Sequence, residues 1–353
     1  MTSTYTILIA DCTNHPYNGE NIDDKATGGI PLVTTRLAEA LAKTGCRVTV
    51  RNNTPENLTA QGVIWENRST SELAGTQPDF IIACNDVTLF NDYKDMIEKG
   101  SIPVLWIHNL FTWKRVFKKG RLKSLFHYKP DAVFLGTYHA NQCSSLMPFK
   151  SRTIIPHGVD DRFFNTQKSS TPNPPQALFL SKAFRGFNHI LDLWMTQIHA
   201  QCPDARLKAF IGRNELPSLK FNEQSLINAN VDILNRAAQS VVINEITKST
   251  CLIYPGHKDE TFCNVAAEST VLGLPIITRG IGSLSERIKN GAGLCATSDD
   301  QMVKAIVQCL SDPKTAQDLS IKAAAQRDQY QWKNRTLDWL ALFARLKSSP
   351  LHT

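Results

Sequence analysis

The chain has 353 residues, of which 42% are hydrophobic, and a formal net charge of +7. This length and apolar content suit two domains, each with a sizeable core. No apolar run approaches the roughly 18 residues of a membrane-spanning helix, and no signal-peptide pattern opens the chain. The nine cysteines are scattered without a C-x-x-C pair, which indicates a reducing compartment. We therefore expect a cytoplasmic protein.

Short β-branched runs alternate with Ala- and Leu-rich stretches, which is typical of an α/β fold with parallel sheets. The expected strands are 5–10, 47–51, 80–84, 104–108 and 132–136 in the first half, and 177–181, 206–211, 251–254 and 275–278 in the second. The segment 168–175 (KSSTPNPP) cannot form a helix, so we interpret it as a linker. We expect domains over residues 1–165 and 166–330, followed by a helix.

Two features of the first half concern ligands. Gly28 and Gly29 follow Thr27 and precede the first long helix, where glycines permit close approach of the backbone to a phosphate or an acceptor. The G-x-G-x-x-G fingerprint of a dinucleotide-binding dehydrogenase is absent. His108 ends an expected strand at the carboxyl edge of the sheet, where open α/β sheets bind ligands. A lone histidine there is otherwise structural more often than not.

The segment 111–130 (FTWKRVFKKGRLKSLFHYKP) contains seven Lys or Arg residues and no acid. Aromatic residues are interleaved with them, so the segment has the pattern of an amphipathic surface attracted to anionic lipid headgroups on the inner face of a membrane. A solvated face beside the active cleft, or a site for an acidic acceptor, is the alternative. Nucleic acid is not expected, because no recognisable module accompanies the charges. The candidate residues are Lys114, Arg115, Lys118, Lys119, Arg121 and Lys123.

In the second half, Lys182 and Arg185 follow one expected strand, and Glu260 and Glu268 flank the point where another gives way to a helix. Unpaired amides and the positive dipole end of a helix N-terminus suit a phosphate. The two carboxylates suit ribose or sugar hydroxyls, although two ordinary surface glutamates would look the same. The candidate amides are those of Phe262, Cys263, Asn264 and Val265.

Five motifs stand in one order: Thr27-Gly28-Gly29; Ile154 to Asp160 with Phe163 and Phe164; Glu260 with Glu268; Gly273 to Ile277; and Gly280, Gly282, Glu286 and Gly291 to Gly293. In that order and spacing, the chain resembles the retaining nucleotide-sugar glycosyltransferases of family four over most of its length. The resemblance implies the GT-B fold, an α/β architecture in which two Rossmann-like domains with parallel sheets face across a cleft. It also implies that the last helix, about 331–353, crosses back to the first domain.

The resemblance further implies transfer of a sugar from a nucleotide-diphosphate sugar, with the leaving phosphate as the base. It implies that His108 lies near the donor sugar, that Lys182 and Arg185 clamp the diphosphate, that Glu260 and Glu268 hold sugar and ribose hydroxyls, and that Gly280 and Gly282 let a second loop approach the donor. The family has Arg before Lys, whereas Lys182 comes first here. His157 stands where the family has Asn, and is expected to be a variant rather than a catalyst.

The chain contains no Asp-x-Asp motif of the kind that holds a metal in many sugar transferases. We therefore expect no metal and no cofactor beyond the donor substrate. Membrane-associated relatives in the resembled family imply a glycan, a glycolipid or another envelope acceptor. A GT-B nucleotide-sugar epimerase or phosphorylase, or a non-catalytic nucleotide-sugar-binding protein, remains the alternative.

Overall fold

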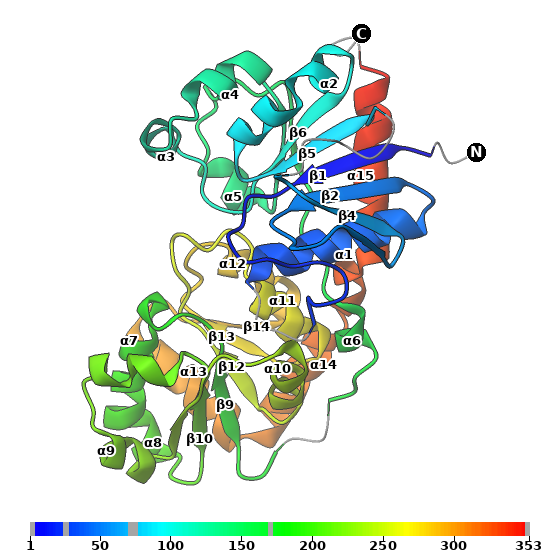
Figure 1. Cartoon of the computed structure of the whole chain (residues 1–353). Helices are drawn as coiled ribbons and strands as arrows, with labels where there is room; N and C mark the ends of the chain where they lie inside the picture. The colour runs from blue at the N-terminus through cyan, green and yellow to red at the C-terminus, as the bar shows by residue number, and fades with distance from the viewer. Residues whose placement is uncertain (1–3, 24–27, 70–76, 169–171, 350–353) are drawn as a thin grey trace. The chain divides into compact units, whose positions relative to one another are not determined.

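The computed structural model describes residues 4–23, 28–69, 77–168 and 172–349. The chain divides into two compact units (Figure 1). Unit 1 is Met1–Gly158 with Trp332–Thr353, and unit 2 is Val159–Gln331. Each contains a largely parallel sheet. Thr27, and Ser169 to Thr171 of the expected linker, lie outside the described residues.

The chain passes from one unit to the other earlier than the expected boundary after residue 165. Helix α6 (Asp161–Phe164) belongs to unit 2, where the Val159 N–H donates to the Tyr330 carbonyl at 2.8 Å. In unit 1, Gly158 lies against the indole of Trp332, because a Cβ on that glycine would come within 2.5 Å of it. The Pro-rich segment therefore lies inside unit 2 rather than between the units.

The sheet of unit 1 has the strand order β3-β4-β2-β1-β5-β6-β7-β8, in which only β3 runs antiparallel to its neighbour. The strands are β1 (Thr6–Ala10), β2 (Arg47–Asn52), β3 (Leu58–Ala60), β4 (Val63–Asn67), β5 (Phe80–Cys84), β6 (Ile102–Trp106), β7 (Asp131–Phe134) and β8 (Arg152–Ile154). Its helices are α1 (Gly29–Lys43), the 3-10 helix η1 (Val87–Tyr93), α2 (Lys94–Glu98), α3 (Trp113–Lys118), α4 (Leu122–Tyr128), α5 (Thr137–Asn141) and α15 (Trp332–Lys347).

Alternation along the strands gives this sheet two apolar faces. Leu8, Ile81 and Leu105 pack with η1, α3 and α4 in one buried cluster. Phe80 precedes Ile81 on β5, so its side chain points to the other face of the sheet. There its ring stacks on that of Phe343 in α15, with centroids 4.3 Å apart, and α15 runs beside the sheet (Figure 1). Both faces are covered, as parallel sheets require.

The sheet of unit 2 is parallel throughout, in the order β11-β10-β9-β12-β13-β14. The strands are β9 (Gln176–Phe179), β10 (Arg206–Ala209), β11 (Val231–Ile233), β12 (Cys251–Ile253), β13 (Ile276–Thr278) and β14 (Gly293–Cys295). After α6 come η2 (Ala183–Arg185), α7 (Phe187–Leu193), the π-helix η3 (Trp194–Ile198), α8 (His199–Gln201), η4 (Arg213–Ser218), α9 (Glu223–Asn228), α10 (Gln239–Thr247), α11 (Asn264–Val271), α12 (Leu284–Arg287), η5 (Lys289–Gly291), α13 (Asp299–Ser311), α14 (Pro313–Ala324) and η6 (Arg327–Tyr330).

The strand order of unit 2 reverses between β9 and β12. From β9 the chain proceeds outward to β10 and β11, and from β12 it proceeds in the opposite direction to β13 and β14. Open α/β sheets bind ligands outside the carboxyl ends of the strands at such a switch point. The strand order of unit 2 alone therefore predicts a ligand site at the loops that follow β9 and β12.

Candidate active site

Three loops meet at the carboxyl edge of the unit 2 sheet, after β9, β12 and β13. Gly186, with φ +103°, lies where a Cβ would be 3.2 Å from the Pro255 ring. Gly282, with φ +71°, lies where a Cβ would be 2.3 Å from the carbonyl oxygen of His257. The Ser283 N–H donates to the Glu260 carbonyl at 3.0 Å. The absence of a side chain at Gly282 therefore lets the loop after β13 lie against the loop after β12. That Gly280 and Gly282 also let this loop approach the donor stays a prediction.

Arg185 and Glu260, 75 residues apart in sequence, form an ion pair across the β9 and β12 loops. The Tyr254 hydroxyl donates to the same Glu260 carboxylate at 2.8 Å. Burial alone would lower the pKa of Arg185, but Glu260 and Tyr254 outweigh it and raise that pKa. The structure thus brings together one predicted cation and one predicted carboxylate. Tyr254, which the sequence analysis did not select as a site residue, completes the group.

Lys182 lies on the same loop as Arg185 but is exposed. Both cations lie over the ring of Phe184, each about 5.9 Å from its centroid. Phe184 is 68% exposed, and its ring meets His257 edge-on at 5.7 Å. An exposed aromatic ring beside two cations offers apolar surface to a ligand, and Phe184 too was missed in the sequence analysis.

The residues expected to supply amides stand at the start of α11. Cys263 is buried and adopts a left-handed conformation with φ +68°, which costs a non-glycine residue about 1–2 kcal/mol. The first helical bonds run from the Ala266 and Ala267 N–H groups to the Cys263 carbonyl, at 3.1 and 3.2 Å. The amides of Asn264 and Val265 therefore precede the first hydrogen bonds within α11, at the positive end of the helix dipole. The Phe262 side chain is buried under the Arg287 guanidinium, 4.5 Å away.

Glu268 belongs to a different polar group from Glu260. Its Oε1 accepts from the Gln239 Nε2 at 3.4 Å. Burial raises its pKa from 4.5 to about 7; Gln239 and Arg162 lower it, whereas Asp160 raises it further. A carboxyl pKa raised this far is unusual for a glutamate and typical of functional sites.

In unit 1, His108 is buried just beyond β6. Its Nδ1 lies 3.1 Å from the His157 Nε2, and the Asn85 Oδ1 accepts from the His108 N–H at 2.7 Å. Burial, His157 and His139 lower the pKa of His108 well below 6.5, so the imidazole is neutral at pH 7. His157 is thus a hydrogen-bonding partner of His108. This pairing was not part of the sequence analysis.

Gly28 is the N-cap of α1, and Gly29 is its first residue. Among the described residues, a Cβ on Gly28 would meet no atom nearer than the Pro31 Cδ at 3.8 Å, and the φ of −68° at Gly28 is open to any residue. The part of the chain that the structure describes therefore gives no packing reason for glycine at position 28. A role in ligand approach stays a prediction for both glycines.

The basic segment folds into α3 and α4. It carries exposed lysines and aromatic rings, and two arginines that bond to other parts of unit 1. The aromatic residues Phe117 and Phe126 are 61% and 50% exposed, and both rings lie near Trp113, with centroids 6.1 and 6.4 Å away. Arg121 is instead buried in an ion pair with Asp86, and Arg115 donates to the Leu110 carbonyl. We define the basic aromatic patch as Trp113, Phe117, Phe126, Lys114, Lys118, Lys119 and Lys123, the lysines all being exposed.

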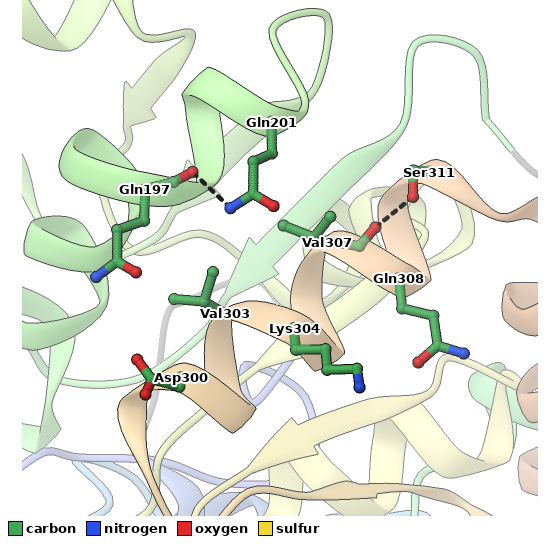
Figure 2. A pocket seen from close by; sticks show the side chains of 8 residues that line it. All are labelled: Gln197, Gln201, Asp300, Val303, Lys304, Val307, Gln308 and Ser311. Carbon is green, nitrogen blue, oxygen red and sulfur yellow. Dashed lines mark hydrogen bonds between the residues drawn. The ribbon is translucent and has the colours of Figure 1, made fainter.

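A pocket of about 680 Å³ opens on another surface of unit 2 (Figure 2). It is lined by residues of η3, α8 and α13, and no predicted site residue is among them. Within the described ranges, no group of three or more His, Cys, Asp or Glu side chains is placed to hold a metal. No helix of the described chain has the length and apolar character needed to cross a bilayer.

Comparisons with known proteins bear on unit 2 and on the fold. The sequence model of the family described as glycosyl transferases group 1 matches residues 162–326. No curated protein matches the chain in the sequence comparison.

Solved structures resemble the whole chain. Sucrose-phosphate synthase from Thermosynechococcus elongatus is 15% identical with a TM-score of 0.71, over 97% of this chain and 99% of that one. WaaG, a glycosyltransferase involved in lipopolysaccharide biosynthesis, is 13% identical with a TM-score of 0.65, over 95% and 99%. Anabaena Alr3699/HepE in complex with UDP and glucose is 13% identical with a TM-score of 0.70, over 96% and 99%. The predicted GT-B class, two α/β units with parallel sheets, is confirmed, and residues 162–326 match the family of glycosyl transferases group 1.

Proposed function

We propose that the protein is a retaining, metal-independent transferase of family four, which moves a sugar from a nucleotide-diphosphate sugar to a glycan or glycolipid acceptor. The observation that carries the proposal is the Arg185–Glu260–Tyr254 group at the β9/β12 switch point. It lies in the part of the chain that matches the group 1 family model. The solved complex of Anabaena HepE with UDP and glucose supports a nucleotide-sugar donor.

The chemistry follows from the charge that develops on the leaving group. Breaking a glycosyl–phosphate bond leaves negative charge on the diphosphate, and preorganised donors lower the barrier where that charge accumulates. We assign this role to Arg185, helped by Lys182 and the amides that begin α11. Because Glu260 holds Arg185 in place, the guanidinium is oriented before the donor arrives. The neutral imidazole of His108 suits hydrogen bonding to a sugar hydroxyl rather than charge neutralisation.

The proposal is tested by screening nucleotide sugars by thermal shift and then following transfer with the ligand that binds. A ligand of the folded state raises the melting temperature. We expect one nucleotide sugar to do so, the product to keep the donor's anomeric configuration by NMR, and EDTA to leave the rate unchanged. Inversion, or loss of activity with EDTA, would contradict the mechanism. Epimerised donor, or binding without turnover, would favour the epimerase or the non-catalytic alternative.

For the acceptor side, we propose that the basic aromatic patch contacts an anionic membrane. Exposed rings at the headgroup level and lysines around them match an interfacial surface, at about 1 kcal/mol per lysine. We expect Lys118→Glu with Lys119→Glu to lower co-sedimentation with phosphatidylglycerol vesicles at least tenfold. The double variant Lys43→Glu with Lys333→Glu makes the same charge change at exposed positions outside the patch and serves as the control. Equal loss in both would refute the patch.

A further inference from the structure

A continuous polar chain leads from the segment after Gly158 to Glu268. The Asp160 carboxylate accepts from the Arg162 Nε at 2.9 Å and from its Nη2 at 3.3 Å. The same Nη2 donates to the Gln239 Oε1 at 2.6 Å, and the Gln239 Nε2 reaches Glu268 at 3.4 Å. All four residues belong to unit 2.

The direction of the Gln239 amide follows from the chemistry of its partners. Arginine carries only donors, so the Gln239 atom that faces Arg162 must be the carbonyl oxygen. The NH2 group then points to Glu268, and it can only donate. A hydrogen bond donated to a carboxylate favours the ionised form. Asp160, by fixing Arg162, therefore orients an amide that supports the negative charge on Glu268.

The charged groups around Glu268 have opposite effects on the pKa of its carboxyl. Asp160 raises the pKa of the Glu268 carboxyl, and Arg162 lowers it. On the other elements packed against α11, Arg287 of α12 lies over the Phe262 ring, and Arg327 of η6 donates to the Phe164 carbonyl at 2.6 Å. Gln239 thus supplies the hydrogen bond that acts directly on the carboxylate.

We infer that Gln239 is a positioning residue whose side-chain amide, held by Arg162, supports the ionised form of Glu268, and thereby makes nucleotide binding depend on pH. The inference rests on the proposed function, in which Glu268 holds the ribose diol. An ionised carboxylate accepts from both hydroxyl groups of a diol, whereas a protonated one loses an acceptor position. Binding therefore favours the ionised form, so affinity rises with pH and binding releases protons below the midpoint.

The effect on folding stability has the opposite sign. The pKa of Glu268 is raised from 4.5 to about 7 by burial, with Gln239 opposing that rise. The stability that this shift contributes is fully present below pH 4.5 and is lost as pH rises through about 7. Nucleotide binding and stability of the free protein therefore respond to pH in opposite directions, which separates the binding effect from a general loss of structure.

The experiment follows Glu268 with and without ligand. In the free protein, the carboxyl is titrated by ¹³C NMR, with the resonance assigned by its loss in Glu268→Gln. ADP, GDP, UDP, CDP and dTDP are then titrated separately by calorimetry between pH 6 and 8.5. The variants are Gln239→Ala, Gln239→Glu, which keeps a partner for Arg162, and Gln224→Ala, which removes an exposed glutamine of α9 as a control.

We expect Glu268 to titrate about 0.5–1 pH unit higher in Gln239→Ala, and higher still in Gln239→Glu, with the affinity midpoint moving equally. The control should match the parent, and Glu268→Gln should bind weakly at every pH. An unchanged titration in both Gln239 variants would overturn the inference and leave the proposed function standing. Full affinity in Glu268→Gln, or no binding of any nucleotide, would overturn the ribose assignment and the inference with it.

Discussion

Replacing Arg185 by alanine is expected to lower turnover by about 10²–10³-fold, because the guanidinium is assigned to the leaving diphosphate. The loss should appear in kcat, since charge on the diphosphate grows toward the transition state. Arg185→Lys should recover only part of the rate, because lysine supplies a point charge rather than a planar fork. Steady-state kinetics with the donor identified by thermal shift measure both variants. Near-normal kcat in Arg185→Ala would remove the assignment.

Two further variants separate the loss of leaving-group stabilisation from other effects of removing an arginine. Arg206→Ala removes an exposed arginine at the start of β10, on the opposite edge of the same parallel sheet, and should leave kcat unchanged. Removing Arg185 also leaves the Glu260 carboxylate uncompensated where an anion must bind. Adding Glu260→Gln should therefore lower the donor KM of Arg185→Ala without restoring kcat. Recovery of kcat would mean that the loss came from repulsion rather than from missing stabilisation.

Most of the interior strands were predictable from the sequence because their apolar residues are consecutive or alternate with polar ones. The expected strand 80–84 coincides with β5, and 251–254 differs from β12 by one residue. The edge strands β3, β8, β11 and β14 were missed, and so was the interior strand β4, whose sequence VIWEN ends in polar residues. Each of the four edge strands has three residues, and their apolar positions are too few to stand out from turns. The strand expected at 104–108 begins two residues earlier, at Ile102, and ends at Trp106, so His108 lies in the loop beyond it.

The candidate site divides in the same way. Glu260 was found from its spacing to Glu268, and Arg185 from its position after an expected strand in the resembled family; the fold then brings the two side chains together. Tyr254, Gln239 and Arg162 carry no local signal, since each matters only through a partner distant in sequence. In the basic segment, the sequence cannot tell a buried cation from an exposed one. Net charge marks Arg121 and Lys118 alike, whereas Arg121 is buried against Asp86 and Lys118 is exposed.

Replacing Gly282 by alanine is expected to lower the free energy of unfolding of unit 2 by about 2–4 kcal/mol and to weaken donor binding. About 1–2 kcal/mol comes from the left-handed backbone, with φ +71°. The remainder comes from the new Cβ, which would lie 2.3 Å from the His257 carbonyl oxygen and must push the β12 and β13 loops apart. That displacement moves the backbone that carries Glu260, so the donor dissociation constant should rise more than tenfold. Denaturant unfolding and calorimetry measure the two effects.

Gly291→Ala is the matched control for this change. Gly291 has a similar left-handed φ of +82°, but the nearest neighbour of its Cβ is the flexible Lys322 side chain, at 3.1 Å. The control therefore carries the conformational cost of about 1–2 kcal/mol without the backbone collision. Because the loop around Gly291 carries none of the candidate residues, donor affinity should stay at the parent value. If both variants lost equal stability and equal affinity, close packing of the β12 and β13 loops would not be what holds Glu260 in place.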